Sequence, residues 1–242
     1  MICVSKQILS TVIVGATAAL LSACGGGDLT GETTYPFVTP VLDSVRTYSQ
    51  TFVDSSGNTI DYALTTQITA VNSDGSYTEA SSSPDGVNTV DGITYGTPEN
   101  DSYNNQGQEL GYTYPTSSGG TGTCTLDPHG AGPPFPLTVG ETWQLQYTLS
   151  CNGNAPTSYT QSGTVVDVES VTVPAGAFNA LKLQSTITWT NSEGTTRQEN
   201  VTNWRDVETL RSVKESITIT LSGTTPTGDY LVSETQELQS TS

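Results

Sequence analysis

Residues 44–71 read SVRTYSQTFVDSSGNTIDYALTTQITAV, and their pattern is repeated through most of the chain. In residues 44–53, Tyr48 and Phe52 lie on one face and small polar residues on the other, which is the period-two alternation of a β-strand. The segment Asp54–Asn58 is rich in turn formers, and Gly57 can adopt a positive φ there. Residues 60–71 alternate again, so the stretch predicts an antiparallel hairpin. A further turn at 72–75 and a strand from 76 extend it into a meander.

The second half of the sequence continues this pattern. Trp143, Leu145, Tyr147 and Leu149 share one face of a predicted strand, and a long strand over 158–173 follows, with a predicted bulge near Glu169. Further strands are expected over 181–189, 195–204, 212–221 and 230–238, with turns between them.

The composition supports an all-β fold. Ser, Thr, Gly and Asn are abundant, Tyr occurs 11 times, and no long helical periodicity follows residue 23. The Gly/Ser-rich segment 116–123 is the best internal boundary. It suggests two similar lobes, 41–118 and 124–242, within one domain over 41–242.

The N-terminus has the layout of an export signal. Residues 8–21 form an apolar run that, at ~1.5 Å per residue, is shorter than the ~30 Å membrane core. The sequence Leu21-Ser22-Ala23-Cys24 follows, and it resembles the lipobox of bacterial lipoproteins. The resemblance implies that residues 1–23 are removed and that Cys24 is acylated. The alternative is an ordinary signal peptide with Cys24 as a free thiol.

The residue after the cysteine, Gly25, rather than an Asp, resembles that of lipoproteins sent to the outer membrane. We therefore expect an outer-membrane protein, anchored by lipid on Cys24, that faces the periplasm or the cell surface. Residues 24–40 are Gly- and Thr-rich and are predicted to be a flexible tether.

The charge balance excludes some partners. The formal net charge is −17, and removal of Lys6 with the signal makes the mature chain one charge more acidic. Nucleic-acid binding depends on cations that neutralise phosphates, so nucleic acid is not an expected partner. Electrostatic docking to anionic headgroups is disfavoured for the same reason.

The position of each cysteine in the sequence indicates its role. Cys3 is lost with the signal and Cys24 is the lipid site, which leaves Cys124 and Cys151 in an oxidising compartment. We predict a disulfide between them. The alternative, a metal site, lacks partners because His129 is the single histidine. No cofactor or metal is expected.

A second resemblance covers residues 135–221. The sequences Pro136-Leu137…Val139-Gly140-Glu141-Thr142-Trp143 and Val173-Pro174-Ala175-Gly176-Ala177-Phe178, followed by Trp204, resemble a pattern of uncharacterised bacterial envelope proteins. The resemblance implies an antiparallel, strongly curved sheet or half-barrel, with a β-sandwich as the alternative. It implies no activity.

The sequence lacks the common catalytic motifs, which favours a non-enzymatic protein. His129 lies in a Pro/Gly loop, and no G-x-S-x-G, Walker A or H-E-x-x-H motif occurs. Asp206 and Glu208 could serve glycoside hydrolysis if their geometry matched. Ser212 and Lys214 are expected on one strand face.

Three functions are compatible with the sequence. The first is a non-enzymatic envelope lipoprotein that binds a partner or acts as a scaffold. The second is a carrier of a lipid or other apolar ligand, which needs a large unfilled apolar cavity. The third is a glycan-binding or glycan-cleaving protein, in which tyrosines could stack on sugars. The tyrosines considered are Tyr95, Tyr103, Tyr112 and Tyr114.

Overall fold

The computed structural model describes residues 33–86, 88–90, 93–116, 118–130, 132–224 and 228–242. Every regular element in these ranges is a β-strand. None of the described residues forms a helix that could cross a membrane. The strands are β1 (Thr34–Tyr35), β2 (Val45–Asp54), β3 (Thr59–Val71), β4 (Tyr77–Ser82), β5 (Asn88–Val90), β6 (Ile93–Tyr95), β7 (Glu99–Tyr103), β8 (Glu109–Pro115), β9 (Thr121–Asp127), β10 (Leu137–Thr138), β11 (Thr142–Cys151), β12 (Thr157–Val173), β13 (Gly176–Thr190), β14 (Thr195–Asp206), β15 (Ser212–Gly223) and β16 (Leu231–Thr241).

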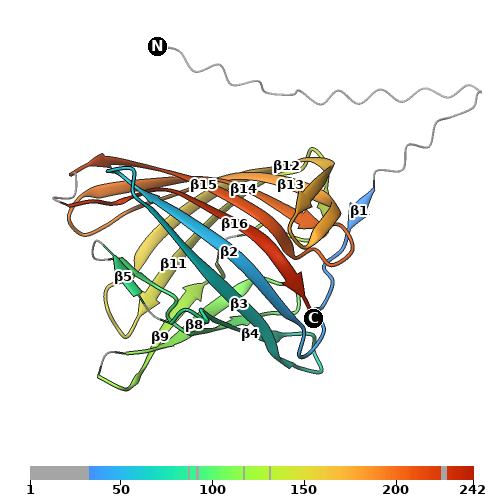
Figure 1. Ribbon diagram of the computed structural model, residues 1–242, viewed down its shortest axis with the longest axis horizontal. Coiled ribbons are helices and arrows are strands. Elements are labelled where there is room, and N and C mark those ends of the chain that lie inside the picture. Colours follow the sequence, from blue (N-terminus) through green and yellow to red (C-terminus); the bar gives the residue numbers. More distant parts are fainter. Residues whose placement is uncertain (1–32, 87, 91–92, 117, 131, 225–227) are drawn as a thin grey trace, which may run out of the picture. The chain divides into compact units, whose positions relative to one another are not determined.

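Twelve of these strands form a closed antiparallel barrel (Figure 1). Its order is β11-β12-β13-β14-β15-β16-β2-β3-β4-β7-β8-β9. The barrel closes where the C-terminal strand β16 pairs with β2, placing Gln236 opposite Gln50. The predicted half-barrel and sandwich are therefore wrong, although the antiparallel all-β prediction is confirmed. Closure leaves no unpaired sheet edge, which an open half-barrel would have exposed.

The predicted turns connect the strands as expected. Asp54 accepts hydrogen bonds at Oδ1 from the backbone N–H of Ser56 (2.9 Å) and Asn58 (2.8 Å), which fixes the β2–β3 turn. Pro174 and Ala175 form the loop between β12 and β13. The bulge in β12 lies between Val165 and Asp167, earlier than predicted.

The ranges proposed as lobes, 41–118 and 124–242, both contribute strands to this one barrel. Within the segment 116–123, expected to be a boundary, residues 121–123 belong to β9, which pairs with β8. The Thr116 N–H donates to the Gly120 carbonyl oxygen over 2.9 Å there.

The last part of the predicted tether is ordered against the barrel. Strand β1 pairs with β10, and the ring of Phe37 lies 6.1 Å from that of Tyr77 and 5.3 Å from that of Phe135. The prediction of a flexible segment is wrong for residues 33–40, because Tyr35 and Phe37 find apolar partners. Residues 1–23, Cys24 and the tether as far as residue 32 lie outside the described residues.

The apolar core is divided among several clusters of buried residues. One contains Tyr48, Val171, Val173, Ala180, Val213 and Leu238, and another contains Leu137, Trp143, Val165, Leu181, Leu183 and Leu210. Trp143 packs over Gly163, where a Cβ would lie 2.2 Å from the indole Cζ2. A third cluster contains Phe52, Ile219 and Leu231.

Candidate functional sites: the acid wall and the hydroxyl face

Acidic and aromatic side chains on β4, β7 and β8 form one wall of the barrel interior. The strand register places Tyr77, Tyr103 and Glu109 side by side in one row. The neighbouring row is Glu79, Asp101 and Tyr112. Glu99 shares the face of Asp101 and Tyr103, because alternate residues of a strand lie on one face. We call Glu99, Asp101 and Glu109 the acid wall.

A bulge in β8 turns Glu109 toward this row. Tyr103 pairs with Glu109 and Ser102 with Gly111, so Leu110 is the extra residue and is exposed. Gly111 has a φ of 151°, and a Cβ there would lie 2.3 Å from the Cys124 carbonyl oxygen. Only glycine fits at this position without displacing β9.

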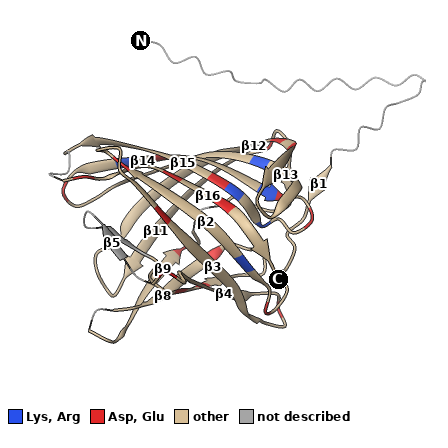
Figure 2. Ribbon diagram, viewed as in Figure 1, with Lys and Arg blue, Asp and Glu red and all other residues tan. Residues whose placement is uncertain are grey.

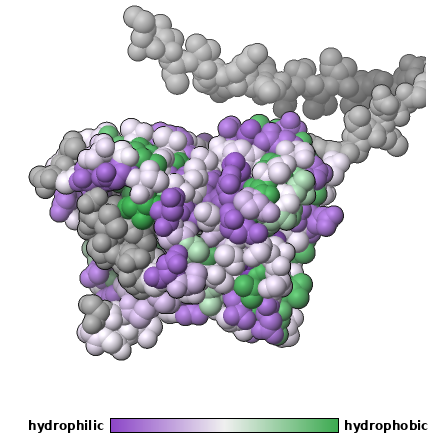
Figure 3. Space-filling model, viewed as in Figure 1, coloured by the Kyte–Doolittle hydropathy of each residue, from purple (hydrophilic) through white to green (hydrophobic). Residues whose placement is uncertain are grey.

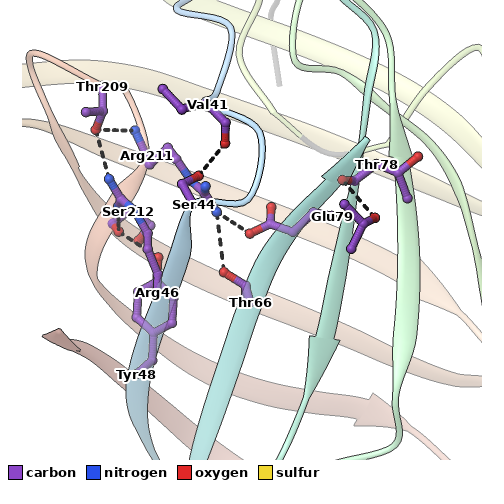
Figure 4. Close-up of polar contacts among 11 residues, drawn as sticks. Val41, Ser44, Arg46, Tyr48, Thr66, Thr78, Glu79, Thr209, Arg211 and Ser212 are labelled. Carbon is purple, nitrogen blue, oxygen red and sulfur yellow. Dashed lines mark hydrogen bonds and ion pairs between the residues drawn. The ribbon is translucent and has the colours of Figure 1, made fainter. Parts of the chain in front are cut away.

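Two arginines border the same region, Arg46 on β2 and Arg211 in the loop between β14 and β15 (Figure 4). Arg211 pairs with Glu79 and donates to Thr66 Oγ1 over 3.3 Å. Arg46 donates to the Ser212 carbonyl oxygen and to Thr209 Oγ1, each over 3.0 Å. Glu79 is therefore neutralised by an arginine.

A cavity of about 360 Å³ is lined by Asp101 and Glu109 of the acid wall and by Arg205 and Arg211. Its polar lining includes Tyr48, Tyr77, Glu79, Asp101, Tyr103, Glu109, Arg205, Arg211 and Gln236. A second cavity of about 160 Å³ shares Arg205 and is lined also by Glu199, Asn203 and Glu215. Both cavities are small and carry charged groups, so neither is the large apolar space that an acyl-chain carrier needs.

The acids of the interior have raised pKa values. Burial raises the pKa of Asp101 to about 8, with a further contribution from Glu109, Glu99 and Glu79. Burial, and then Glu99, raises the pKa of Glu109 to about 7. Burial also raises the pKa of Glu99. A desolvated carboxyl group favours its neutral form unless a cation stands beside it.

The outward side of β11–β15 has a different character. In the centre of these strands the outward residues are hydroxyl and amide side chains in register across the sheet. They are Thr142, Gln144, Gln146, Ser158, Thr160, Ser162, Thr164, Gln184, Thr186, Thr188, Gln198, Asn200, Thr202, Ser216, Thr218 and Thr220. We call this set the hydroxyl face.

The hydroxyl face holds a groove of about 720 Å³. Its outward lining is Thr142, Gln144, Ser162, Thr164, Gln184, Thr186, Asn200 and Thr202. None of these side chains is charged, although the chain carries a net charge of −17. In Figure 2 the charged residues form small groups along an otherwise tan barrel wall. In Figure 3, hydrophilic and intermediate residues cover most of the side shown, and apolar residues form small separate patches.

A charged band borders the hydroxyl face. Trp204 lies between Lys182 and Lys214, whose Nζ atoms are 5.5 and 5.8 Å from the indole centroid. Glu169 and Glu237 pair with these lysines over 3.4 and 2.7 Å. The band shows that charge is present on the outer wall but is kept out of the groove.

The predicted disulfide is confirmed. Cys124 on β9 and Cys151 on β11 are opposite each other in the register and are bonded, with Cα atoms 4.0 Å apart. The bond links the two strands at which the first and second halves of the barrel meet. The lipidation site, Cys24, lies outside the described residues.

The other residues considered from sequence do not form a catalytic set. The ring nitrogens of His129 contact Gln108 Nε2 and the Gly130 carbonyl oxygen, each at 3.1 Å. Asp206 is buried and accepts a hydrogen bond from Thr209 Oγ1 over 2.8 Å, so it supports the β14–β15 turn, while Glu208 is exposed.

Ser212 and Lys214 separate because the register shifts beside them. Asn203 on the inner face donates to Ser212 Oγ over 3.0 Å, whereas Lys214 pairs with Glu237 in the outer band. The prediction that Ser212 and Lys214 share a face is wrong. No group of ligands suited to a metal ion occurs among the residues that the structure describes.

The tyrosines expected to stack on sugars are mostly part of the barrel wall. Tyr103 stacks on Tyr77 with 4.6 Å between ring centroids, and Tyr114 accepts a hydrogen bond from Asn152 over 2.8 Å. The side chain of Tyr95 lies outside the described residues. Sequence reasoning missed the acid wall, although the alternation Glu99, Asp101, Tyr103 was a visible signal for a strand face.

Comparison with protein-family models and with curated proteins finds no match to the sequence. A solved structure shares the fold. A Bacteroides fragilis protein described as exported, with a YmcC-like fold, superposes with a TM-score of 0.51 at 12% identity and covers 87% of this chain and 100% of its own. A protein from Parabacteroides distasonis described as a lipoprotein gives a TM-score of 0.48 at 14% identity, covering 86% and 99%. The hypothetical lipoprotein YmcC of Escherichia coli gives 0.40 at 11% identity, covering 79% and 85%. The first of these likenesses defines the class: a closed antiparallel barrel of the YmcC-like fold.

Proposed function

We propose that this protein is a non-enzymatic envelope lipoprotein that binds a neutral glycan on its hydroxyl face. Acyl chains on Cys24 anchor it to the outer membrane. The lipobox Leu21-Ser22-Ala23-Cys24 supports the anchor. The uncharged groove across β11–β14 supports the glycan.

The chemistry of the groove suits a hydroxylated ligand. Side chains such as Thr186 and Thr202 offer a hydroxyl that both donates and accepts, and Gln184 and Asn200 offer an amide with both functions. Sugars present the same mixed donors and acceptors. An acidic polymer would be repelled by a chain of net charge −17, and a cationic one would find no carboxylate in the groove.

A partly organised surface favours binding. Thr186 Oγ1 donates to Asn200 Oδ1 over 3.1 Å, and these residues are fixed on neighbouring strands of a closed barrel. A ligand therefore meets groups that are already positioned, which reduces the entropy lost on binding. The carrier of an apolar ligand is the weaker alternative because the cavities of about 360 and 160 Å³ described above carry charged groups.

The anchor is tested by metabolic labelling with a palmitate analogue. The wild-type chain should incorporate the label and fractionate with outer membranes. Cys24→Ser should lose both properties. A Cys24→Ser chain that retains the label would contradict the proposed anchor.

The glycan is tested by a binding assay against an array of neutral and acidic oligosaccharides. The expected result is binding to neutral glycans alone. Binding that requires a carboxylated or sulfated glycan would contradict the proposal.

A further inference from the structure

The guanidinium group of Arg205 forms no ion pair with any residue that the structure describes. It lines both cavities, and its Nε donates to Asn203 Oδ1 over 3.2 Å. Its two Nη atoms have no hydrogen-bond partner within the described part of the chain. Glu215 acts on it electrostatically, but Glu215 Oε2 accepts a 2.6 Å hydrogen bond from Asn203 Nδ2. A guanidinium fork in a desolvated site normally holds a carboxylate or a phosphate, so the missing partner of Arg205 is an anion.

Two further donors beside the larger cavity also lack an acceptor. Arg211 lines this cavity, and its Nη1 atom is buried without a hydrogen-bond partner among the described residues. Tyr77 is only 9% exposed and lines the same cavity, yet its hydroxyl has no partner in the described ranges. Burial raises the pKa of Tyr77, so the hydroxyl keeps its proton and remains a donor. Buried polar groups are normally satisfied, and all of these donors require an acceptor.

The acids beside the cavity leave Arg205 without a counter-charge there at mildly acidic pH. Glu79 is already neutralised by Arg211. Burial raises the pKa of Asp101 to about 8 and that of Glu109 to about 7, so both carboxyl groups keep their protons under these conditions. A protonated carboxyl group can donate a hydrogen bond and does not repel an anion.

Apolar and aromatic side chains line another part of the cavity. Phe37, Leu64 and Leu210 belong to this part, and the rings of Tyr77 and Tyr103 stack with their centroids 4.6 Å apart. The volume of about 360 Å³ has room for a small organic molecule. An inorganic anion would leave these apolar walls uncovered. A carboxylate on a compact aromatic or branched aliphatic group would place its oxygens on the donors and its carbons against the walls.

We propose that the cavity lined by Arg205, Arg211 and Tyr77 binds a small organic carboxylate that has an apolar body. Arg205 holds the carboxylate through its Nη atoms, and the Tyr77 hydroxyl donates to one of its oxygens. This site is independent of the glycan proposed for the hydroxyl face, because the groove and this cavity share no lining residue. The net charge of −17 is spread along the chain, and salt screens it beyond about 8 Å, whereas the guanidinium contacts the ligand directly.

The site predicts binding that weakens as the pH rises. Loss of protons from Asp101 and Glu109 places negative charge beside the bound carboxylate, and their pKa values of about 8 and about 7 put this loss between pH 5.5 and pH 8.5. The carboxylate of the ligand titrates at about pH 4 and is ionised throughout this range. The affinity should therefore be higher at pH 5.5 than at pH 8.5. The other charged or titratable groups around these acids and the cavity are Arg46, Tyr48, Tyr77, Glu79, Glu99, Tyr103, Tyr112, His129, Arg205, Arg211 and Glu215.

The test is isothermal titration of the purified full-length lipoprotein, in non-ionic detergent micelles, with benzoate. Benzamide is the uncharged probe of nearly the same shape, and inorganic phosphate is the anion without an apolar body. The variants are Arg205→Gln, which removes the fork, and Tyr77→Phe, which removes one hydroxyl donor. The matched control is Lys182→Gln, which removes the same charge from the charged band on the outer wall.

The expected result is saturable benzoate binding at pH 5.5 and at least tenfold weaker binding of benzamide. Benzoate binding should weaken at least tenfold in Arg205→Gln and about threefold in Tyr77→Phe, and it should be unchanged in Lys182→Gln. Thermal unfolding of each variant confirms that it folds. Tyr77→Phe changes the shape of the side chain very little, so it tests the site even if Arg205→Gln does not fold.

Several outcomes would overturn the proposal. One is the absence of saturable benzoate binding by the wild type at pH 5.5, and another is equal affinity for benzamide, which would show that only the apolar walls bind. Unchanged affinity in Arg205→Gln and Tyr77→Phe would place the ligand elsewhere. Tighter binding of phosphate than of benzoate would show a site for an inorganic anion. An equal loss in Lys182→Gln would show attraction by net charge alone.

Discussion

Trp204 on β14 donates a 2.5 Å hydrogen bond from its indole Nε1 to Oε1 of Glu169 on β12. The bond crosses the intervening strand β13, where Lys182 pairs in register with Trp204. The indole therefore ties three strands of the outer wall together at the border of the hydroxyl face. These contacts hold Glu169, Lys182 and Trp204, which are far apart in sequence, beside one another at the edge of the groove.

Loss of this indole should destabilise the barrel. We expect Trp204→Leu to lower the free energy of unfolding by about 1–3 kcal/mol, because a hydrogen bond and two cation–π contacts are lost. Lys214→Met, the matched change in the same band, should cost less than about 1 kcal/mol, because the Lys214–Glu237 pair is partly exposed. Urea denaturation measures the free energy of unfolding of both variants. Equal losses in the two variants would contradict this role for Trp204.

The disulfide should stabilise the meeting point of β9 and β11. Cys124→Ser with Cys151→Ser is expected to lower the free energy of unfolding by about 3.5 kcal/mol, since the bond closes a loop of sequence separation 27. Denaturation of the oxidised wild type and the double variant tests this. A difference below about 1 kcal/mol would show that strand pairing alone holds the barrel closed.

The close approach of Trp143 to Gly163 gives a sharp packing test. Gly163→Ala places a Cβ against the rigid indole, so we expect a loss of about 1–3 kcal/mol. Gly228→Ala is the control, because a Cβ there meets no atom within 4 Å. The melting temperature should fall for the first variant only. A fall of the same size in Gly228→Ala would point to a general effect of replacing glycine.

The acid wall should make the stability depend on pH. In the unfolded chain Asp and Glu titrate near pH 4, whereas burial raises the pKa of Asp101 to about 8 and that of Glu109 to about 7. Between these values the folded state binds more protons than the unfolded state, so the contribution of these groups to stability falls as the pH rises. The wild type should therefore melt at a lower temperature at pH 8.5 than at pH 5.5.

The double variant Asp101→Asn with Glu109→Gln should reduce this fall, because its side chains stay neutral throughout. Glu193→Gln should leave the dependence unchanged, since that residue is exposed. Scanning calorimetry across this pH range makes the comparison. An unchanged slope in the double variant would show that these acids are not held neutral by the fold.

The strands were predictable because their patterning is local. The alternation in 44–53 and the turn formers at 54–58 define β2 and its turn, and Pro174-Ala175 defines the loop after β12. Closure was not predictable, because it depends on the pairing of Gln50 with Gln236, which no local pattern encodes. The sheet was therefore expected to stay open.

The candidate sites also differ in how far the sequence predicts them. The alternation of Thr, Ser, Gln and Asn was present in the sequence, but its alignment into one face depends on register across five strands. The acid wall depends on the bulge at Leu110 and on the inward side of a closed barrel. The hydroxyl face and the acid wall could be recognised only in the tertiary structure. The lipidation site Cys24 and the Cys124–Cys151 disulfide were both predicted from the sequence. Of these two, only the disulfide lies within the described residues.

The most direct test of the proposed function compares charge substitutions on two outer walls of the barrel. Gln184→Glu with Asn200→Asp adds charge in the groove with almost no change of shape, and Gln67→Glu adds the same kind of charge on the exposed face of β3. Affinity for the best neutral glycan of the array is measured for each purified full-length protein. The account predicts at least a tenfold loss for the groove variant and no change for Gln67→Glu. Wild-type protein that binds no neutral glycan, or equal losses in both variants, would contradict it.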